Sequence, residues 1–313
     1  MTAVLDFLRN RTIFALILLL ALFVAGVEAA RPGTVTPLWI SNVLLFAAPL
    51  AIMGAGQTLV MLTGGIDLSV ASVATGAAYL LATNASSGDV TALAVALALG
   101  VVVGIVNGIG VAVLRVQPLI MTLGTGLMTG GVMIVYSQQM LASQPHVPAF
   151  IQTLGAGKVA GLVPVDLFLW LVIGGLMLFS LHRTGFGRLL YAIGDNGEAC
   201  HLAGIRVWRV LFVDYLLCSV LAAIAGLVLV GGTNASDLSL ADAYLLPSIA
   251  CVIIGGTSIF GGRGGYSGTI VGALILTVLT SLLTLLDVTE PVKQILYGAI
   301  ILLLAAAYAR LTA

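Results

Sequence analysis

Long apolar segments, separated mostly by short polar connections, run through the whole chain. A helix needs about 20 mostly apolar residues to cross a bilayer, and glycine-rich interruptions are tolerated inside a helical bundle. The pattern predicts an all-α polytopic membrane protein with about ten transmembrane helices in one domain, residues 1–313. The predicted spans lie near residues 12–30, 40–62, 66–83, 91–114, 118–136, 165–182, 210–231, 247–262, 266–286 and 293–309.

Charge is too scarce for an ordinary soluble protein. Asp, Glu, Lys and Arg supply 8% of the residues, whereas soluble domains carry about 25%. The surface of the folded chain is therefore expected to face a lipid bilayer. The formal net charge is zero and the sequence has no basic run, so no nucleic-acid partner is expected.

The distribution of Lys and Arg orients the predicted spans. An even number of spans places both termini on one side, and cytoplasmic loops are the ones enriched in Lys and Arg. With a cytoplasmic N-terminus, three of the 12 basic residues, Arg31, Lys158 and Lys293, are external. The cytoplasmic ones are Arg9, Arg11, Arg115, Arg183, Arg188, Arg206, Arg209, Arg263 and Arg310. The long connection 183–209 is then cytoplasmic, and the long connection 137–164 is external.

Glycine pairs spaced four residues apart indicate close helix packing. The pairs Gly104–Gly108, Gly126–Gly130 and Gly268–Gly272 lie inside predicted spans. Such spacing lets helix backbones approach closely in lipid. The sequence therefore predicts a compact bundle rather than a set of separate membrane anchors.

No arrangement of residues suited to catalysis, metal binding or nucleotide binding is present in the sequence. GAGKV at 155–159 lacks the first glycine of a phosphate-binding loop and has Val after its Lys. Cys200, Cys218 and Cys251 do not have the spacing of metal ligands, and the three histidines are scattered. We therefore expect no catalytic residue, no metal site and no cofactor in this chain.

The cytoplasmic segment GRLLYAIGDNGEACHLAGIRVWRV, residues 187–210, combines charge with the signals of a short helix. Asp195 and Glu198 have the D-x-x-E spacing of a capping box, and Gly204 stands where a left-handed residue ends a helix. A helix of about eight residues is marginal alone in water. It must therefore rest on its own bundle, lie on the membrane surface or bind a partner.

Three stretches together resemble the permeases of ABC-type sugar importers, in the ribose, xylose and galactose branch. They are GRLLYAIGDNGEACHLAGI at 187–205, GQTLVMLTGGIDLSVAS at 56–72 and IIGGTSIFGGRGGYSGTIVGALIL at 253–276. Their order and wide spacing extend the resemblance over essentially the whole chain. The resemblance implies a multi-pass protein of the bacterial inner membrane whose two halves, roughly spans 2–5 and 7–10, repeat in opposite orientation.

The resemblance also implies partners. A permease of this kind pairs with a second permease, identical or different, and receives its sugar from a periplasmic sugar-binding protein. A cytoplasmic ABC ATPase, which carries ATP and Mg, docks on the coupling helix at 195–204. The residues implied in this docking are Asp195, Asn196, Glu198, Ala199, His201, Leu202 and Gly204. The chain departs from the usual family pattern at Asp195, Gly197, Cys200 and His201.

Several polar residues are candidates for the transport pathway or its gate. Asp67 and Ser69 follow the break LTGGIDLS, and Arg263 lies in the glycine-rich break GGTSIFGGRGG. Asp67 has two explanations: its charge stabilises a helix N-terminus, or it belongs to the transport pathway. Because Asp67 and Arg263 have opposite charges on the same predicted side, they could also form an ion pair. The uncharged candidates are Gln57, Asn107 and Thr122, which suit a neutral, hydroxyl-rich solute and equally suit hydrogen bonds between helices.

The alternative function is a stand-alone secondary transporter of a small neutral solute. Such a protein needs ionisable residues near the bilayer centre for coupling to an ion gradient. The acidic residues outside the two breaks fall at or near predicted span ends; they include Glu28, Asp89, Asp166, Asp214, Asp237 and Asp287. This placement favours transport driven by a separate ATPase.

Overall fold

The computed structural model describes residues 12–139 and 146–312, and almost all of them are helical. The α-helices are α2 (Thr12–Ala30), α3 (Pro37–Leu62), α4 (Val70–Asn84), α5 (Asp89–Ala112), α6 (Pro118–Gln139), α7 (Ala149–Ala156), α8 (Val165–Arg183), α9 (Gly185–Leu202), α10 (Val207–Thr233), α11 (Leu245–Ile254), α12 (Tyr266–Leu285) and α13 (Glu290–Thr312). Two 3₁₀ turns, η1 (Ala85–Ser87) and η2 (Asp242–Tyr244), and a small hairpin of β1 (Lys158–Val159) and β2 (Val163–Pro164) complete these residues. The predicted all-α class is confirmed. Arg9 and Arg11 lie outside the described residues.

Each predicted span contains a helix, but the helices differ in length. Seven of the described helices, α2, α3, α5, α6, α8, α10 and α12, are long and apolar enough to cross a membrane. In contrast, α4 has 15 residues and α11 has ten. The predicted span 247–262 is wrong in extent, because α11 ends at Ile254 and glycines at positive φ, among them Gly256 and Gly261, carry the chain onward as a turn. The count of ten crossings stays a prediction.

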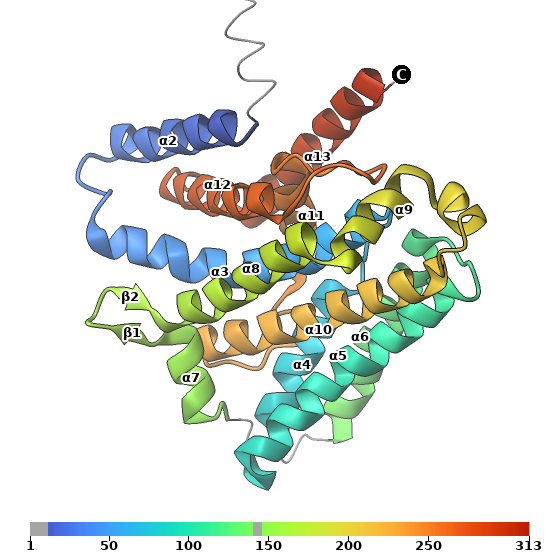
Figure 1. The fold of residues 1–313 in the computed structure, drawn as a ribbon. Helices are drawn as coiled ribbons and strands as arrows, with labels where there is room; N and C mark the ends of the chain where they lie inside the picture. The colour runs from blue at the N-terminus through green and yellow to red at the C-terminus, as the bar shows by residue number, and fades with distance from the viewer. Residues whose placement is uncertain (1–11, 140–145, 313) are drawn as a thin grey trace, which may run out of the picture.

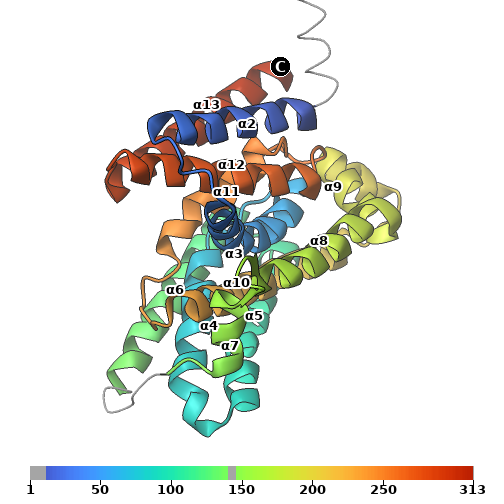
Figure 2. The same cartoon turned by 90° about the vertical axis from the view of Figure 1, so that its left-hand side faces the viewer.

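Helices α3 and α10 form the centre of the molecule, and the other helices are arranged around them in layers. Helix α10 makes its most extensive contacts with α5, α3 and α4, and α12 packs against α2, α3 and α11. Figure 1 shows α2, α12 and α13 above this centre and α4, α5, α6 and α7 below it. The view in Figure 2 gives the same order of layers. Helix α3 is buried without interruption from Ala47 to Leu62.

Close glycine contacts hold several of these helices together. A Cβ atom on Gly104 would approach the Leu216 Cα atom of α10 to 2.8 Å, and one on Gly108 would approach the Phe212 side chain to 2.8 Å. Gly268 and Gly272 pack in the same way against the backbone of α11 and the turn after it. The glycine-spacing prediction is confirmed for these two pairs. A Cβ atom on Gly130 would meet no atom within 4 Å, whereas one on Gly126 would approach the Ser69 Cα atom to 3.3 Å. Only Gly126 of this pair therefore makes a close contact.

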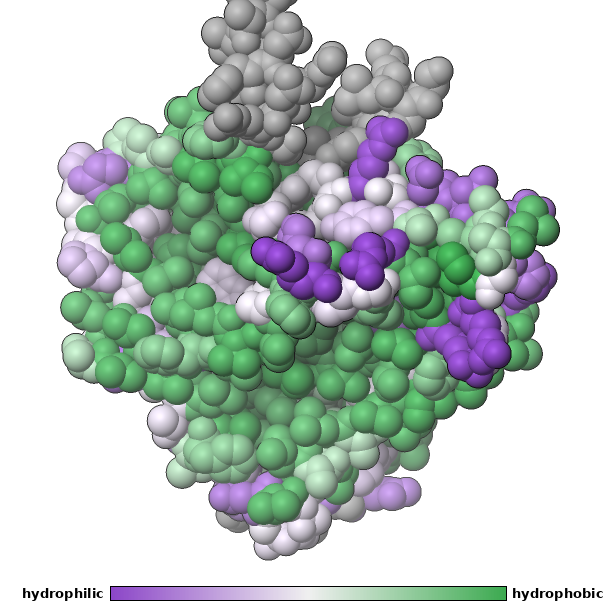
Figure 3. Space-filling model, in the orientation of Figure 1, coloured by the Kyte–Doolittle hydropathy of each residue, from purple (hydrophilic) through white to green (hydrophobic). Residues whose placement is uncertain are grey.

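The outward faces of the helices are apolar, as a protein in lipid requires. Large exposed hydrophobic side chains follow one another on α5 and α8, including Val102, Ile105, Leu171, Leu176 and Phe179. In Figure 3 hydrophobic residues cover most of this face, and hydrophilic side chains lie at its left and right edges, at its lower end and in a group above its middle. Exposed apolar area on this scale marks a surface that water does not cover, which agrees with a polytopic membrane protein.

Candidate coupling and transport site

Helix α9 consists of two helical parts joined at a kink. Asn196 has φ −157° and ψ 94°, so its backbone is extended inside an otherwise helical segment. The side-chain oxygen of Asn196 accepts a hydrogen bond from the Ala199 N–H at 2.9 Å and thereby caps the second part. The sequence placed the cap at Asp195; the structure corrects it to Asn196, because the extended residue is the one whose side chain can reach back to the free N–H groups.

The second part of α9 ends in a Schellman motif at Gly204. The Ile205 N–H donates to the Cys200 carbonyl and the Gly204 N–H donates to the His201 carbonyl, both at 3.0 Å. Gly204 has φ +81°, a left-handed conformation that glycine adopts without steric cost. The predicted short helix with a terminal glycine is therefore present over residues 197–202.

One face of this short helix is exposed and the other is anchored. Cys200 is buried in the main hydrophobic core, whereas the seven residues that the resemblance implies in ATPase docking are all exposed. Leu202 is the most notable of them, with 81% of its surface exposed although it is apolar. An apolar side chain presented this far out of a helix is suited to burial by another molecule.

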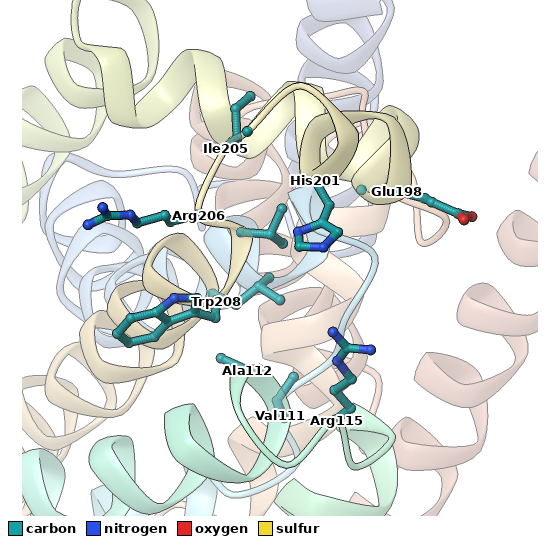
Figure 4. Close-up of a pocket in the computed structure, with 12 residues that line it drawn as sticks. Val111, Ala112, Arg115, Glu198, His201, Ile205, Arg206 and Trp208 are labelled. Atoms are coloured by element: carbon teal, nitrogen blue, oxygen red, sulfur yellow. The ribbon is translucent and has the colours of Figure 1, made fainter.

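A cavity of about 660 Å³ lies beside the short helix, between it and the ends of α5 and α10. Arg115, His201, Arg206 and Trp208 line it together with apolar residues of α5 and α10. Figure 4 shows His201 and Arg115 extending into the cavity from opposite sides, while the Glu198 carboxylate points away from it. The short helix thus combines an outward acidic group with a basic recess at its base.

The first part of α9 is joined to both glycine-rich breaks. A Cβ atom on Gly194 would overlap the Leu62 carbonyl oxygen at the end of α3 and the Gly262 backbone nitrogen. The Gly262 N–H donates to that Leu62 carbonyl at 3.0 Å, and the Tyr191 hydroxyl donates to the Gly264 carbonyl at 2.9 Å. We call this contact of residues 62–64, 191–194 and 261–264 the glycine junction. It brings the first part of α9 and the two glycine-rich breaks to one place.

The uncharged pathway candidates and Asp67 come together in one hydrogen-bonded network inside the bundle. Asp67 Oδ1 accepts from the Ser69 hydroxyl at 2.6 Å, and the Ser69 hydroxyl accepts from the Asn107 amide at 2.9 Å. The Gln57 side-chain amide donates to the Asp67 carbonyl, and Thr122 accepts from the Leu68 N–H at 3.0 Å. Gln57, Asp67, Ser69, Asn107 and Thr122 are all fully buried. The network holds the break against α3, α5 and α6, and a role of its members in the pathway stays a prediction.

Arg263 does not join this network. Its side chain is exposed, whereas Asp67 is fully buried. Across the described residues the structure records one ion pair, Glu290 with Lys293 at 3.4 Å. The proposed pairing of Asp67 with Arg263 is therefore not formed here, because the glycine junction turns Arg263 outward while Asp67 bonds to its own loop.

Sequence reasoning missed two further buried carboxylates. Asp214 lies on α10, is fully buried and accepts a hydrogen bond from the Thr63 hydroxyl at 2.9 Å. Asp166 at the start of α8 is also fully buried. The sequence pattern placed both residues near span ends, where side chains are usually exposed. Asp214 nevertheless interrupts the apolar run VLFVDYLLC, and a charged residue inside such a run was the available sign of a buried carboxylate.

The described residues form a helical bundle with seven helices long and apolar enough to cross a membrane, and comparison with known proteins assigns it to the membrane permeases of transport systems. The chain belongs to the family described as branched-chain amino acid transport system / permease component, whose model matches residues 39–305.

Relatives with established names cover nearly the same length. The ribose import permease protein RbsC of Escherichia coli K12 is 36% identical over 304 residues, 95% of this chain and 92% of that protein. The fructose import permease protein FrcC of Rhizobium meliloti is 34% identical, over 84% of this chain and 76% of that protein. The autoinducer 2 import system permease protein LsrC of Escherichia coli O157:H7 is 31% identical, over 94% and 85%. The resemblance inferred from the three sequence stretches is confirmed, and the chain is a multi-pass permease of the inner membrane rather than an enzyme.

Proposed function

We propose that this chain forms, with a second permease, the pathway by which an ABC importer takes up a monosaccharide or a similar small polyhydroxy solute. Ribose and fructose permeases among the relatives support the substrate class. The family description names amino acids, but the relatives named here carry neutral or hydroxyl-rich cargo, so the sugar proposal rests on them. The observation that carries the proposal is the short helix 197–202, capped at both ends and exposed on one face.

The orientation follows from the positive-inside count and from α9. We infer ten crossings, with both termini and α9 in the cytoplasm and the hairpin of β1 and β2 outside. In this arrangement α4 and α11 are partial crossings that meet the glycine-rich segments 63–69 and 255–265. Such interrupted helices in both halves are the usual pointer to a transport pathway between inverted repeats.

Energy reaches the permease through α9. A cytoplasmic ABC ATPase that holds ATP and Mg grips the exposed face of the short helix, with Leu202 and Glu198 as its main contacts. The basic recess with Arg115, His201 and Arg206 accepts an acidic side chain of the ATPase. Closure of the ATPase then moves α9 as a rigid arm, and the glycine junction transmits the movement to both breaks.

The remaining partners lie outside and beside the chain. A periplasmic sugar-binding protein docks on the external segment 137–164, of which the structure describes 137–139 and 146–164. The second permease is an identical copy or a related chain. The stand-alone secondary transporter remains the alternative, and the following test distinguishes it from the ABC permease.

The test is ATP-dependent uptake of labelled D-ribose and D-fructose by cells that express the chain in its native host. Glu198→Arg reverses the charge on the docking face, so we expect it to abolish uptake while the protein remains inserted in the membrane. Asp89→Arg makes the same charge change on an exposed residue at the start of α5, the end of that helix that lies away from the short helix 197–202. We expect this variant to retain uptake. Uptake that survives in the Glu198→Arg variant would remove the coupling assignment.

A further inference from the structure

A second cavity, of about 730 Å³, lies at the end of the molecule opposite to α9. Residues of α3, η2, α11, α12 and α13 line it, together with residues of the connections 31–36 and 286–289, which we call its mouth. The proposed orientation makes this mouth external. Ligand cavities of small molecules have about this size and combine apolar and aromatic walls with a few polar groups.

The α12 wall of the cavity is a stripe of hydroxyl groups. Thr277, Thr280, Ser281 and Thr284 all line the cavity, at spacings of three, one and three residues. Residues three and four apart lie on the same face of a helix. They are also the only polar residues from Thr277 to Leu285, so every polar side chain in this half of α12 lines the cavity. The partly buried Leu282 packs instead against the buried cluster that contains Val27 and Val278.

Two of these hydroxyl groups, those of Thr277 and Ser281, and the nearby Asn42 amide retain hydrogen-bonding capacity, whereas Thr280 is bonded to the Tyr297 hydroxyl at 2.6 Å and Thr284 accepts from Lys293 at 2.9 Å. Thr277 donates to the Ala273 carbonyl of its own helix at 2.9 Å, which leaves the lone pairs of its oxygen as acceptors. The Ser281 oxygen accepts from the Trp39 indole N–H at 3.0 Å, which leaves the Ser281 proton to donate. The Asn42 oxygen accepts from the Lys158 ammonium at 2.8 Å, which leaves the Asn42 amide protons free to donate. The cavity thus offers donors and acceptors to a solute that has both.

Aromatic side chains form the other walls. Trp39 and Phe46 line the cavity from α3, Tyr244 from η2 and Tyr297 from α13. Aromatic rings provide large rigid apolar surfaces, and Trp and Tyr add a polar group at one edge. A sugar ring presents C–H groups on its faces and hydroxyl groups on its rim, so it matches an aromatic wall opposite a hydroxyl stripe.

The charged residues that line the cavity lie at its mouth. Arg31, Asp287 and Glu290 line the cavity, and all three are exposed. The buried part is lined by neutral residues such as Leu50, Pro247, Leu276 and Thr277. The buried Lys293 ammonium donates to the lining Thr284 hydroxyl at 2.9 Å, but it is already paired with Glu290 at 3.4 Å. A charged solute inside would therefore meet no unpaired charge of opposite sign, and burial of an unpaired charge is costly. The lining therefore selects a neutral solute.

We propose that this cavity is the outer solute site of the permease and binds a neutral polyhydroxy molecule on its way into the pathway. The proposal rests on the proposed function and adds the place and the chemistry of recognition. Helix α3 then joins two functional sites, because residues 39–50 line this cavity and Leu62 ends in the glycine junction.

Cysteine accessibility tests the site directly. Thr277→Cys places a thiol in the cavity, and Val278→Cys places one on the buried opposite face as the matched control. The three native cysteines are buried, so the unmodified chain serves as the background. In right-side-out membrane vesicles we expect a membrane-impermeant maleimide to label the Thr277→Cys variant and not the Val278→Cys variant. We expect D-ribose or D-fructose to slow the labelling of the Thr277→Cys variant, and the anion D-ribonate to leave its labelling unchanged.

Transport gives a second readout. Thr277→Val removes the hydroxyl at nearly constant shape, and the hydroxyl bonds only to its own helix, so the fold has no need of it. We expect uptake at low sugar concentration to fall about threefold to tenfold, the effect of one lost hydrogen bond, while Thr277→Ser stays close to the unmodified chain. Suppose that the unmodified chain imports the sugar. The assignment of this cavity is then overturned if the Thr277→Cys variant is not labelled, if the sugar does not protect it, or if ribonate protects it equally. If the unmodified chain imports neither sugar, the proposed function itself fails.

Discussion

At the scale of single residues, Asn107 is the connection on which the buried network depends. Its amide donates to the Ser69 hydroxyl at 2.9 Å and its oxygen accepts from the Thr125 hydroxyl at 2.7 Å. One side chain of α5 thereby joins the break before α4 to α6. Buried polar groups that pair in this way favour one arrangement of helices, and the loss of a partner leaves a group unsatisfied.

This connection makes a prediction for α6. Thr125→Val leaves the Asn107 oxygen without its donor, so we expect the free energy of unfolding in mixed micelles to fall by about 0.5–2 kcal/mol. Thr129→Val is the matched control, because Thr129 is buried on the same helix and donates only to the Thr125 carbonyl of that helix. Equal losses in the two variants would contradict the network.

Residue-level features were only partly predictable from the sequence. Gln57, Asp67, Ser69, Asn107 and Thr122 stand out as polar residues in apolar runs, and they do meet. The cap at Asn196 was missed because Asp195 and Asn196 are both good capping residues, and only the extended backbone at 196 decides between them. The burial of Asp214 depends on how α10 packs against Thr63, which no local pattern contains.

At the scale of elements, the second part of α9 is a helix of residues 197–202 that depends on its caps. A helix this short has few internal hydrogen bonds and is stabilised by its ends and by Cys200 in the core. The glycine junction fixes the other end of the arm. The contacts at Gly194 leave no room for a side chain, so the arm and the two breaks are held at backbone distance.

The cap assignment makes a prediction for this element. Asn196→Ala removes the acceptor of the Ala199 N–H, at a cost of about 1 kcal/mol. We expect amide hydrogen exchange in a peptide that covers 196–205 to accelerate about fivefold, the factor that corresponds to this free energy. Asp195→Ala is the control and should leave the exchange rate unchanged. Acceleration by Asp195→Ala alone would return the cap to the residue that the sequence favoured.

Element boundaries were predictable where a helix crosses the bilayer in one piece, as α5 and α12 show. They were less predictable for α4, which begins after the glycine-containing break 63–69, and for α11, which ends at the glycine-rich segment 255–265. Hydropathy continues through such segments, because glycine is not polar enough to end an apolar run, whereas the backbone has already turned at Gly64 and Gly256 with positive φ. The physical cause is backbone geometry, which a hydropathy pattern does not record.

At the scale of the whole molecule, the chain is organised along α3. The outer cavity with its hydroxyl stripe lies at the start of α3, and the glycine junction with α9 lies at its end. Movement of α9 by a docked ATPase would therefore act on a helix that also lines the outer solute site. This arrangement explains why a chain without nucleotide-binding residues has an exposed, capped helix that its own bundle does not cover.

The most direct test of this account is the composition of the complex. The tagged chain is extracted from its native membranes in a mild detergent and its partners are identified and quantified by mass spectrometry. We predict an ATP-binding subunit in near-stoichiometric amount with the unmodified chain and with Asp89→Arg, and its loss with Glu198→Arg. Recovery of the chain without an ATPase, or an ATPase that remains bound to the Glu198→Arg variant, would contradict the account.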